Sequence, residues 1–226
     1  MRLRLFARGF LTYGLCRARG KALAAFLLLA GPGFADGPVT VLALGDSLTQ
    51  GYGLVQEDGF VPQLEAWLSA AGTPATLING GVSGDTTQGG ASRVGWSLTD
   101  DVDAMIVALG GNDLLRAIDP AVSRANLDKI LSVAAAQDVD VLLIGLEAPG
   151  NYGPDYKAAF DAMYPDLAQT YDTLYLHSFF AGLADAAGAG RGAFFQPDGI
   201  HPNAAGVARI VEGIGPHVQA LIARAE

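Results

Sequence analysis

From residue 38 onward, the chain alternates short apolar runs with segments whose apolar residues recur at helical spacing. The apolar runs are nearly continuous, which is typical of strands that are buried on both faces. The segments between them repeat their apolar residues every three or four positions, as amphipathic helices do. This alternation predicts an α/β fold in which helices cover both faces of a parallel sheet. The expected strands span residues 39–44, 75–78, 104–109, 141–146 and 173–176.

Four helices are expected to pack on this sheet. Their apolar faces contain, in chain order, Val61, Leu64, Trp67 and Leu68, then Val122, Leu127, Ile130, Leu131 and Ala134, then Tyr156, Phe160, Met163 and Leu167, and finally Val207, Ile210, Val211, Ile214, Val218, Leu221 and Ile222. Asp119 and Pro120 suit the N-cap and first turn of the second helix. Asn203 suits the N-cap of the last one. Residues 184–192, rich in glycine and alanine, predict a surface loop.

The charge of the chain is unevenly distributed. Residues 1–35 carry six basic and no acidic side chains, so the formal net charge of -9 becomes -15 for residues 36–226. Such an acidic surface repels phosphate backbones and anionic headgroups, which argues against nucleic acid as a partner and against electrostatic docking on anionic membranes. Half of the 226 residues are hydrophobic, so residues 36–226 can form one domain with a substantial core.

Residues 1–35 have the pattern of a signal peptide. A basic stretch through Lys21 precedes the apolar run of residues 22–30, and Gly33-Phe34-Ala35 resembles a small-residue cleavage site. The run has about half of the roughly 20 residues that a membrane helix needs, so we expect no stable span; an uncleaved anchor is the alternative. We predict cleavage near Ala35 and a periplasmic or secreted protein. Cys16, the only cysteine, would be removed, leaving neither disulfide nor thiol nucleophile.

Polar motifs follow the first three expected strands, and a fourth motif precedes the last helix. They are Gly45-Asp46-Ser47-Leu48, Ser83-Gly84-Asp85, Gly110-Gly111-Asn112-Asp113 and Asp198-Gly199-Ile200-His201-Pro202. In open parallel sheets, ligands bind beyond the carboxyl ends of strands, where the strand order reverses. With the order 2-1-3-4-5, the motifs that hold Ser47 and Asn112 face each other across a cleft at that point.

Ser47 and His201 each have a chemical and a structural interpretation. Ser47 lies between strand and helix, where its hydroxyl can serve as a nucleophile, or where Asp46 or Ser47 can cap the helix. His201 can be a general base whose imidazole is oriented by Asp198, or the segment can be an Asx-turn that enters a helix. The two other histidines lack an acidic residue three positions earlier.

Gly84 and Asn112 are candidates for stabilising a developing oxyanion. Attack on an ester places negative charge on the carbonyl oxygen, and the N–H groups of Ser47 and Gly84 and the side-chain amide of Asn112 can donate to it. Gly84 also suits a left-handed turn, and Asn112 a helix cap. A hydroxyl nucleophile, an acid-base pair and oxyanion donors are together what ester or thioester hydrolysis requires.

In order and context, these motifs resemble those of the GDSL or SGNH hydrolase superfamily. Residues 39–222 resemble its thioesterase I, protease I and lysophospholipase L1 (arylesterase) branch, with further matches at Thr49, Gly51-Tyr52, Thr86-Thr87, Asn151-Tyr152-Gly153 and Asn203. The resemblance implies a three-layer, flavodoxin-like fold with a five-stranded sheet, and export to the periplasm. It also implies a catalytic triad of Ser47, Asp198 and His201, an oxyanion hole of Ser47, Gly84 and Asn112, and neither metal nor cofactor.

The resemblance further implies a serine esterase that acts on small-molecule acyl esters or thioesters, including aryl esters and lysophospholipids. The negative charge disfavours acyl-CoA, and we expect a monomer. The expected substrate contacts are Asp46, Leu48, Asp113, Leu114 and Tyr152.

Leu114 departs from the branch, which often has glycine after Asn-Asp, so the acyl-chain preference of the branch does not transfer. Two alternatives stay open: deacetylation of an envelope carbohydrate on the same fold, and a non-catalytic envelope binding protein.

Overall fold

The structure, a computed structural model, describes residues 37–188 and 191–226. The signal peptide expected at residues 1–35, with Cys16, lies outside the described residues. In the part of the chain that the structure describes, no helix is both long enough and apolar enough to cross a membrane.

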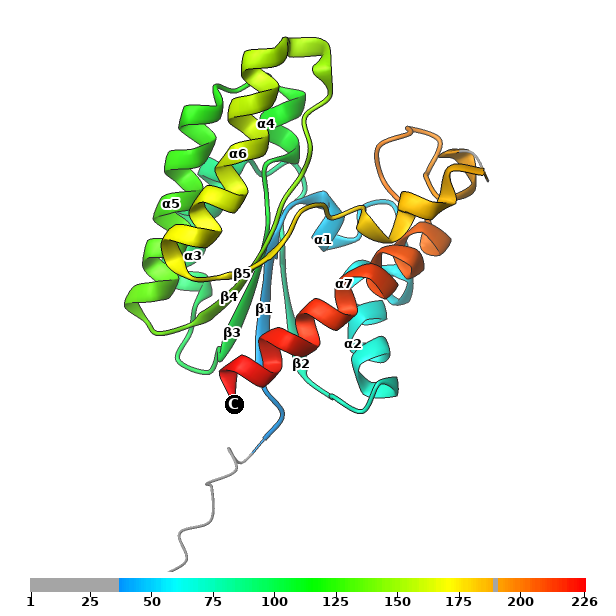
Figure 1. The fold of residues 1–226 in the computed structure, drawn as a ribbon. Coiled ribbons are helices and arrows are strands. Elements are labelled where there is room, and N and C mark those ends of the chain that lie inside the picture. Colours follow the sequence, from blue (N-terminus) through cyan, green and yellow to red (C-terminus); the bar gives the residue numbers. More distant parts are fainter. Residues whose placement is uncertain (1–36, 189–190) are drawn as a thin grey trace, which may run out of the picture. The chain divides into compact units, whose positions relative to one another are not determined.

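A five-stranded parallel sheet forms the centre of residues 37–226 (Figure 1). Its strands run in the order β2-β1-β3-β4-β5, which confirms the predicted topology. Their bounds are β1 Thr40–Gly45, β2 Thr76–Gly81, β3 Ala104–Ala108, β4 Asp140–Ile144 and β5 Leu174–Leu176. Only β2 differs much from its prediction, because it continues through Asn79-Gly80-Gly81 in register with β1.

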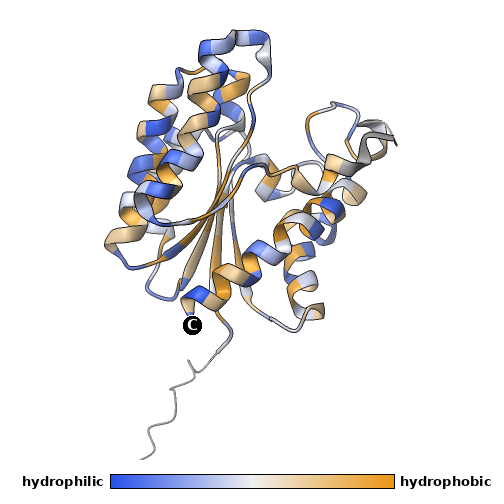
Figure 2. Cartoon of the chain, viewed as in Figure 1, coloured by the Kyte–Doolittle hydropathy of each residue, from blue (hydrophilic) through white to orange (hydrophobic). Residues whose placement is uncertain are grey.

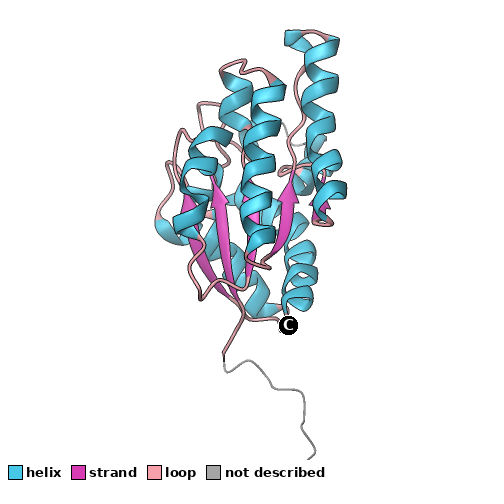
Figure 3. Ribbon diagram, turned by 90° about the vertical axis from the view of Figure 1, so that its left-hand side faces the viewer, coloured by secondary structure: helices cyan, strands magenta, loops and turns pink. Residues whose placement is uncertain are grey.

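Helices cover both faces of this sheet. They are α1 Ser47–Gln50, α2 Phe60–Ala70, α3 Thr87–Ser97, α4 Gly111–Leu115, α5 Pro120–Ala136, α6 Pro154–Tyr171 and α7 Ala204–Ala225. The helices α3, α5 and α6 lie on one face, and α2 and α7 lie on the other (Figures 1 and 3). Short 3-10 helices span Gln56–Asp58, Gly150–Tyr152, Ala181–Gly188 and Arg191–Ala193, and the last two occupy part of the stretch expected to be a loop.

Two hydrophobic cores, one on each face, explain why the central strands β1, β3 and β4 are almost continuously apolar. In β3, Met105 and Val107 pack toward α5 and α6, whereas Ala104 and Ile106 pack toward α2 and α7. The ribbon coloured by hydropathy shows apolar strands between helices whose outer faces are polar (Figure 2). The predicted caps are confirmed, because Asp119 accepts from the N–H of Ala121 and Asn203 from that of Gly206. Val122 is an exception to the predicted faces, since it is 48% exposed.

The helix α3 was not predicted, because its sequence combines three glycines with few apolar residues. Tertiary packing stabilises it. A Cβ at Gly90 would clash with the side chain of Leu109, just after β3, so glycine lets α3 pack closely there without displacing that leucine. Arg93, almost fully buried, extends from α3 to the carbonyl of Gly45, to which it donates a hydrogen bond of 2.8 Å. These contacts offset the low helix propensity of the segment.

The strands β1, β2 and β3 end at one edge of the sheet. Gly45 lies opposite Gly81 in β2 and opposite Ala108 in β3. The segments that follow the three strands therefore begin side by side. A Cβ at Gly45 would clash with Thr49 and would lie 3.1 Å from the carbonyl oxygen of Ala108, so a larger residue cannot fit between α1 and β3.

We expect Gly45→Ala to lower the free energy of unfolding by roughly 1–3 kcal/mol, because Thr49 is buried and its β-branched side chain cannot turn away. Gly95→Ala is the matched control, since its Cβ would meet no atom within 4 Å on the exposed side of α3. That variant should be unchanged or more stable by up to roughly 1 kcal/mol. Urea unfolding followed by circular dichroism measures both, and equal stabilities would contradict the packing argument.

Candidate active site

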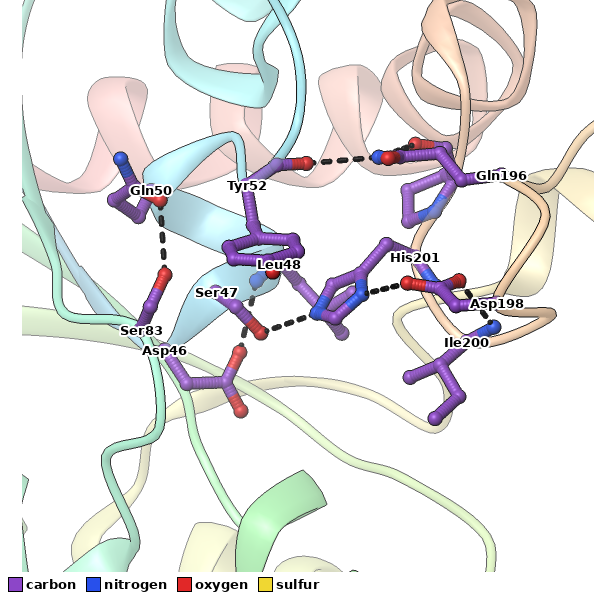
Figure 4. Close-up of polar contacts among 11 residues, drawn as sticks. Asp46, Ser47, Leu48, Gln50, Tyr52, Ser83, Gln196, Asp198, Ile200 and His201 are labelled. Atoms are coloured by element: carbon purple, nitrogen blue, oxygen red, sulfur yellow. Dashed lines mark hydrogen bonds and ion pairs between the residues drawn. The ribbon is translucent and has the colours of Figure 1, made fainter.

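Ser47 is the first residue of α1 and lies two residues after the end of β1. Asp46 is the N-cap of this helix, and its Oδ1 accepts a hydrogen bond of 3.0 Å from the N–H of Leu48. Asp46 therefore holds the turn, and the hydroxyl of Ser47 points toward His201 (Figure 4). Asp46 can thus cap the helix while the hydroxyl of Ser47 remains placed to act as a nucleophile.

His201 links Ser47 to Asp198. Its Nε2 lies 2.9 Å from Ser47 Oγ, and its Nδ1 lies 2.7 Å from Asp198 Oδ2 (Figure 4). The other carboxylate oxygen of Asp198 accepts hydrogen bonds from the N–H groups of Ile200 and His201, which form the expected turn. Asp198 can thus both orient the imidazole of His201 and stabilise the turn of the loop in which His201 lies.

The environment of Asp198 favours its charged form. The hydrogen bond from the His201 side chain, followed by those from the backbone N–H groups of His201 and Ile200, lowers the pKa of Asp198 to about 2. The carboxylate is therefore ionised at neutral pH and can stabilise a positive charge on His201. The ring of Tyr52 lies against the imidazole, with 4.5 Å between the ring centroids.

Gly84 and Asn112 lie beside Ser47, from the segments after β2 and β3. Gly84 has a φ of 84°, which glycine adopts without strain, and its carbonyl oxygen accepts a hydrogen bond of 2.9 Å from Arg116. The Nδ2 of Asn112 donates to the carbonyl of Asp85 at 2.9 Å and, at 3.3 Å, to Asp46. Among the described residues, the backbone N–H groups of Ser47 and Gly84 have no protein acceptor, so both can donate to a ligand.

Asp46 differs from Asp198 because it is buried, with 3% of its surface exposed. Burial raises the pKa of Asp46 to about 6, although the N–H of Leu48, the charge of His201 and the amide of Asn112 act in the opposite direction. The nearby carboxylate of Asp113 raises it further.

A cavity of about 640 Å³ opens over Ser47 and is mostly apolar. Ser47, Gly84, Asn112 and His201 all line it, and so do three of the five expected substrate contacts, Asp46, Leu48 and Leu114. Neither His177 nor His217 is among the residues of the described chain that line it. Further apolar residues of the lining are Leu115, Leu146, Phe180, Phe195 and Ile200.

Comparison with known proteins identifies the family. The model of the GDSL-like Lipase/Acylhydrolase family matches residues 43–209, which include every residue of the site described above. The chain belongs to this family. It is therefore a carboxylic ester hydrolase.

Curated relatives and solved structures of this family are similar over most of the chain. Esterase TesA of Pseudomonas aeruginosa is 35% identical over 184 residues, covering 81% of this chain and 89% of the relative. The thioesterase 1/protease 1/lysophospholipase L1 of Escherichia coli K12 is 33% identical over 185 residues, covering 81% and 85%. The crystal structure of AlinE4, an SGNH-hydrolase family esterase, superposes with a TM-score of 0.67 at 38% identity and covers 83% of this chain and 98% of its own.

Two residues that we expected to contact substrate in this GDSL-like hydrolase lie elsewhere. Asp113 is fully buried, and its carboxylate accepts hydrogen bonds from the N–H and hydroxyl of Thr87 and from the hydroxyl of Ser123. Tyr152 belongs to a 3-10 helix and packs against Tyr156, with ring centroids 5.1 Å apart. Neither residue lines the cavity, and Asp113 instead joins α3 and α5 to the segment that carries Asn112.

Other residues of the site were not recognised in the sequence. Arg93 forms an ion pair of 2.8 Å with Asp85 and donates to the carbonyl of Gly45, so it links the end of β1 to the segment after β2. The side-chain amide of Gln196 donates a hydrogen bond to the backbone carbonyl of Tyr52. Arg93 belongs to no recognised motif, and its bond to Gly45 and that of Gln196 to Tyr52 join residues that are distant in the sequence. Gln196 is the first residue of the turn that ends at Gly199, and its place two residues before Asp198 is a local signal that could have drawn attention to it.

We expect Asp46→Asn to change how the stability of this hydrolase depends on pH. An aspartate whose folded pKa is raised binds more protons folded than unfolded, so wild-type stability falls as pH rises from about 4 to about 6. Asparagine cannot ionise, so the variant should gain roughly 2–3 kcal/mol relative to wild type over that interval. Its altered contact with Asn112 adds an offset that does not depend on pH. Urea unfolding at several pH values measures the difference, and a pH-independent difference would contradict the raised pKa.

Proposed function

We propose that the chain is an exported serine esterase that hydrolyses acyl esters and thioesters through an acyl-enzyme, with residues 36–226 as the mature catalytic domain. The observation that carries the proposal is the continuous pair of hydrogen bonds from Ser47 through His201 to Asp198, of 2.9 and 2.7 Å. This arrangement matches the nucleophile, base and orienting carboxylate of a Ser-His-Asp triad.

In the first step, Ser47 Oγ attacks the acyl carbonyl carbon while His201 Nε2 takes the hydroxyl proton. Asp198 stabilises the imidazolium that results. The N–H groups of Ser47 and Gly84 and the amide of Asn112 hold the oxyanion. The contact of Asn112 with Asp46 is the longer of its two, so that N–H is the one available to the oxyanion. The intermediate collapses, and the alcohol or thiol leaves with the proton from His201.

In the second step, water replaces the leaving group. His201 takes a proton from that water, which attacks the acyl carbon bound to Ser47, and the same donors hold the second oxyanion. Collapse releases the carboxylic acid and returns the proton to Ser47 Oγ. The side chains of one site therefore suffice for both half-reactions.

The cavity supports an acyl chain longer than acetyl. Its volume of about 640 Å³ is within the usual range for sites that bind small organic ligands, and leucine and phenylalanine side chains line it. This lining favours fatty acyl esters over acetylated carbohydrates. The charge of -15 on residues 36–226 favours neutral or zwitterionic substrates, such as lysophospholipids, over acyl-CoA. The names of the relatives include esterase, thioesterase and lysophospholipase, which fits this range.

Export is supported by the sequence of residues 1–35, with its basic stretch, apolar run and small residues before Asp36. Mass spectrometry of the exported protein tests this part of the proposal. A mature chain that begins near Asp36 supports it, and an intact first segment would contradict cleavage.

We expect Ser47→Ala to lower the turnover of p-nitrophenyl esters by about a thousandfold or more, because it removes the nucleophile. The variant should also escape labelling by a fluorophosphonate, which reacts with activated serines. Ser92→Ala is the control, since this serine lies on the exposed side of α3 and bonds only within that helix. Wild-type turnover in folded Ser47→Ala would refute the mechanism, and wild-type protein that resists labelling would indicate a binding protein.

We expect Leu114→Ala to weaken hydrolysis of long acyl esters more than that of acetyl esters, because a longer chain has more apolar surface to pack against the leucine in the cavity. The ratio of kcat/KM for octanoyl over acetyl ester should fall by roughly tenfold, the effect of losing most of one buried leucine contact. Val122→Ala, which changes an exposed residue outside the cavity, should leave this ratio unchanged. An unchanged ratio in Leu114→Ala would remove Leu114 from the acyl site, and a wild-type preference for acetyl would favour a deacetylase.

A further inference from the structure

Ser47 and His201 belong to two segments that no single element holds together. Ser47 begins α1 two residues after the end of β1, whereas His201 lies in the loop before α7, 154 residues later. The hydrogen bond between their side chains is 2.9 Å long, and catalysis requires that it be kept. Other contacts must therefore fix the loop of His201 relative to the turn of Ser47.

Gln196 makes such a contact with its side chain. Its Nε2 donates one hydrogen bond of 2.8 Å to the carbonyl oxygen of Tyr52 and another of 3.0 Å to that of Pro202 (Figure 4). A primary amide nitrogen carries two hydrogens, so both are used, one on each segment. Because both partners are carbonyl oxygens, only the nitrogen of this amide can face them. We call this pair of bonds the Gln196 clasp.

The backbone of Gln196 ties the same side chain to the loop of His201. Its N–H donates to the carbonyl of His201 at 2.7 Å, and its carbonyl accepts from the N–H of Gly199 at 2.9 Å. Residues 195 and 202 also pair in an antiparallel bridge. Gln196 is therefore fixed within the loop, and its side chain reaches from there to Tyr52.

Tyr52 connects the Gln196 clasp to the imidazole of His201. Its backbone carbonyl is the acceptor, and its ring lies against His201 with centroids 4.5 Å apart and planes tilted by 37°. The next residue, Gly53, has a φ of 74°, and a Cβ there would clash with the Oε1 of Gln196. The amide of Gln196 is thus packed closely on the turn that follows α1.

We propose that Gln196 is a positioning residue, whose clasp on Tyr52 and Pro202 holds the imidazole of His201 in line with the hydroxyl of Ser47. The proposal rests on the proposed serine mechanism and adds a residue that acts through His201. Reacting groups displaced by about 1 Å can lose about a hundredfold in rate, so one clasp of this kind can affect turnover strongly.

The test replaces the donor while keeping the length of the side chain. Gln196→Glu places a carboxylate opposite two carbonyl oxygens, and Gln196→Met removes the donor without adding charge. Both variants should lose tenfold or more in kcat and in the rate of fluorophosphonate labelling, while KM stays within about twofold. The loss falls on kcat because Gln196 itself does not line the cavity proposed to bind the acyl chain. Thermal unfolding shows the temperature at which every variant is folded, and all rates are compared there.

Gln63 offers a matched control. Its Nε2 also donates to two backbone carbonyls, those of Asp58 at 2.7 Å and Ala204 at 3.2 Å, and neither of these bonds involves Tyr52 or the loop of residues 196–202. Gln63→Glu and Gln63→Met should lose stability but keep kcat and the labelling rate within about twofold. This comparison separates positioning of His201 from a general loss of stability.

The outcomes separate the two proposals. If wild-type protein labels at Ser47 and both Gln196 variants label at the wild-type rate, the clasp has no positioning role and the serine mechanism stands. An equal loss of kcat in the Gln63 variants would also overturn the positioning role. If wild-type protein does not label at all, the proposed function itself fails.

Discussion

The parallel register of β1 with β2 and β3 is the constraint on which the site depends. Gly45 pairs with Gly81 on one side and with Ala108 on the other, so three strands end together at one edge of the sheet. Ser47 and the proposed oxyanion donors Gly84 and Asn112 lie in the segments that follow these three strand ends. Because a one-residue slip would turn every buried strand side chain to the opposite core, the apolar packing that stabilises the fold also fixes the donors.

Buried polar contacts join the segments that lie at this edge of the sheet. Arg93 joins Asp85 to the end of β1, and Asp113 accepts three hydrogen bonds that connect α3 and α5 with the segment after β3. Buried carboxylates are costly unless they are paired or hydrogen-bonded, and Asp85 is paired with Arg93 while Asp113 accepts three hydrogen bonds. Buried side chains therefore hold the segments of the proposed oxyanion donors. His201 belongs to a separate loop, which depends on contacts such as that of Gln196 with Tyr52. The two halves of the site differ in how they are supported.

Periodicity and motif spacing predicted the strands, the two caps and the grouping of Ser47, Asn112 and His201, whereas the strand order 2-1-3-4-5 came from the resemblance to the family fold. Periodicity failed for α3, because tertiary contacts of Gly90 and Arg93 stabilise that helix against its propensity. A sequence motif also does not predict the direction of each side chain in it. Asp113 directly follows Asn112, yet successive residues at the start of α4 face different directions, so one lines the cavity and the other is buried. Long-range bonds such as that of Gln196 with Tyr52 have no local sequence signal.

Asp46 and Asp198 show how the fold gives one residue type two electrostatic roles. Asp198 lies in a partly exposed turn, where three hydrogen bonds lower its pKa, so a negative charge is present beside the imidazole that becomes positive. Asp46 lies at the buried edge of the sheet, beside the donors of the proposed oxyanion hole, where burial raises its pKa. A negative charge there would oppose the oxyanion, and burial favours the neutral form of Asp46 up to a pH of about 6. The position of each carboxylate in the fold thus determines which of its two forms the surroundings favour.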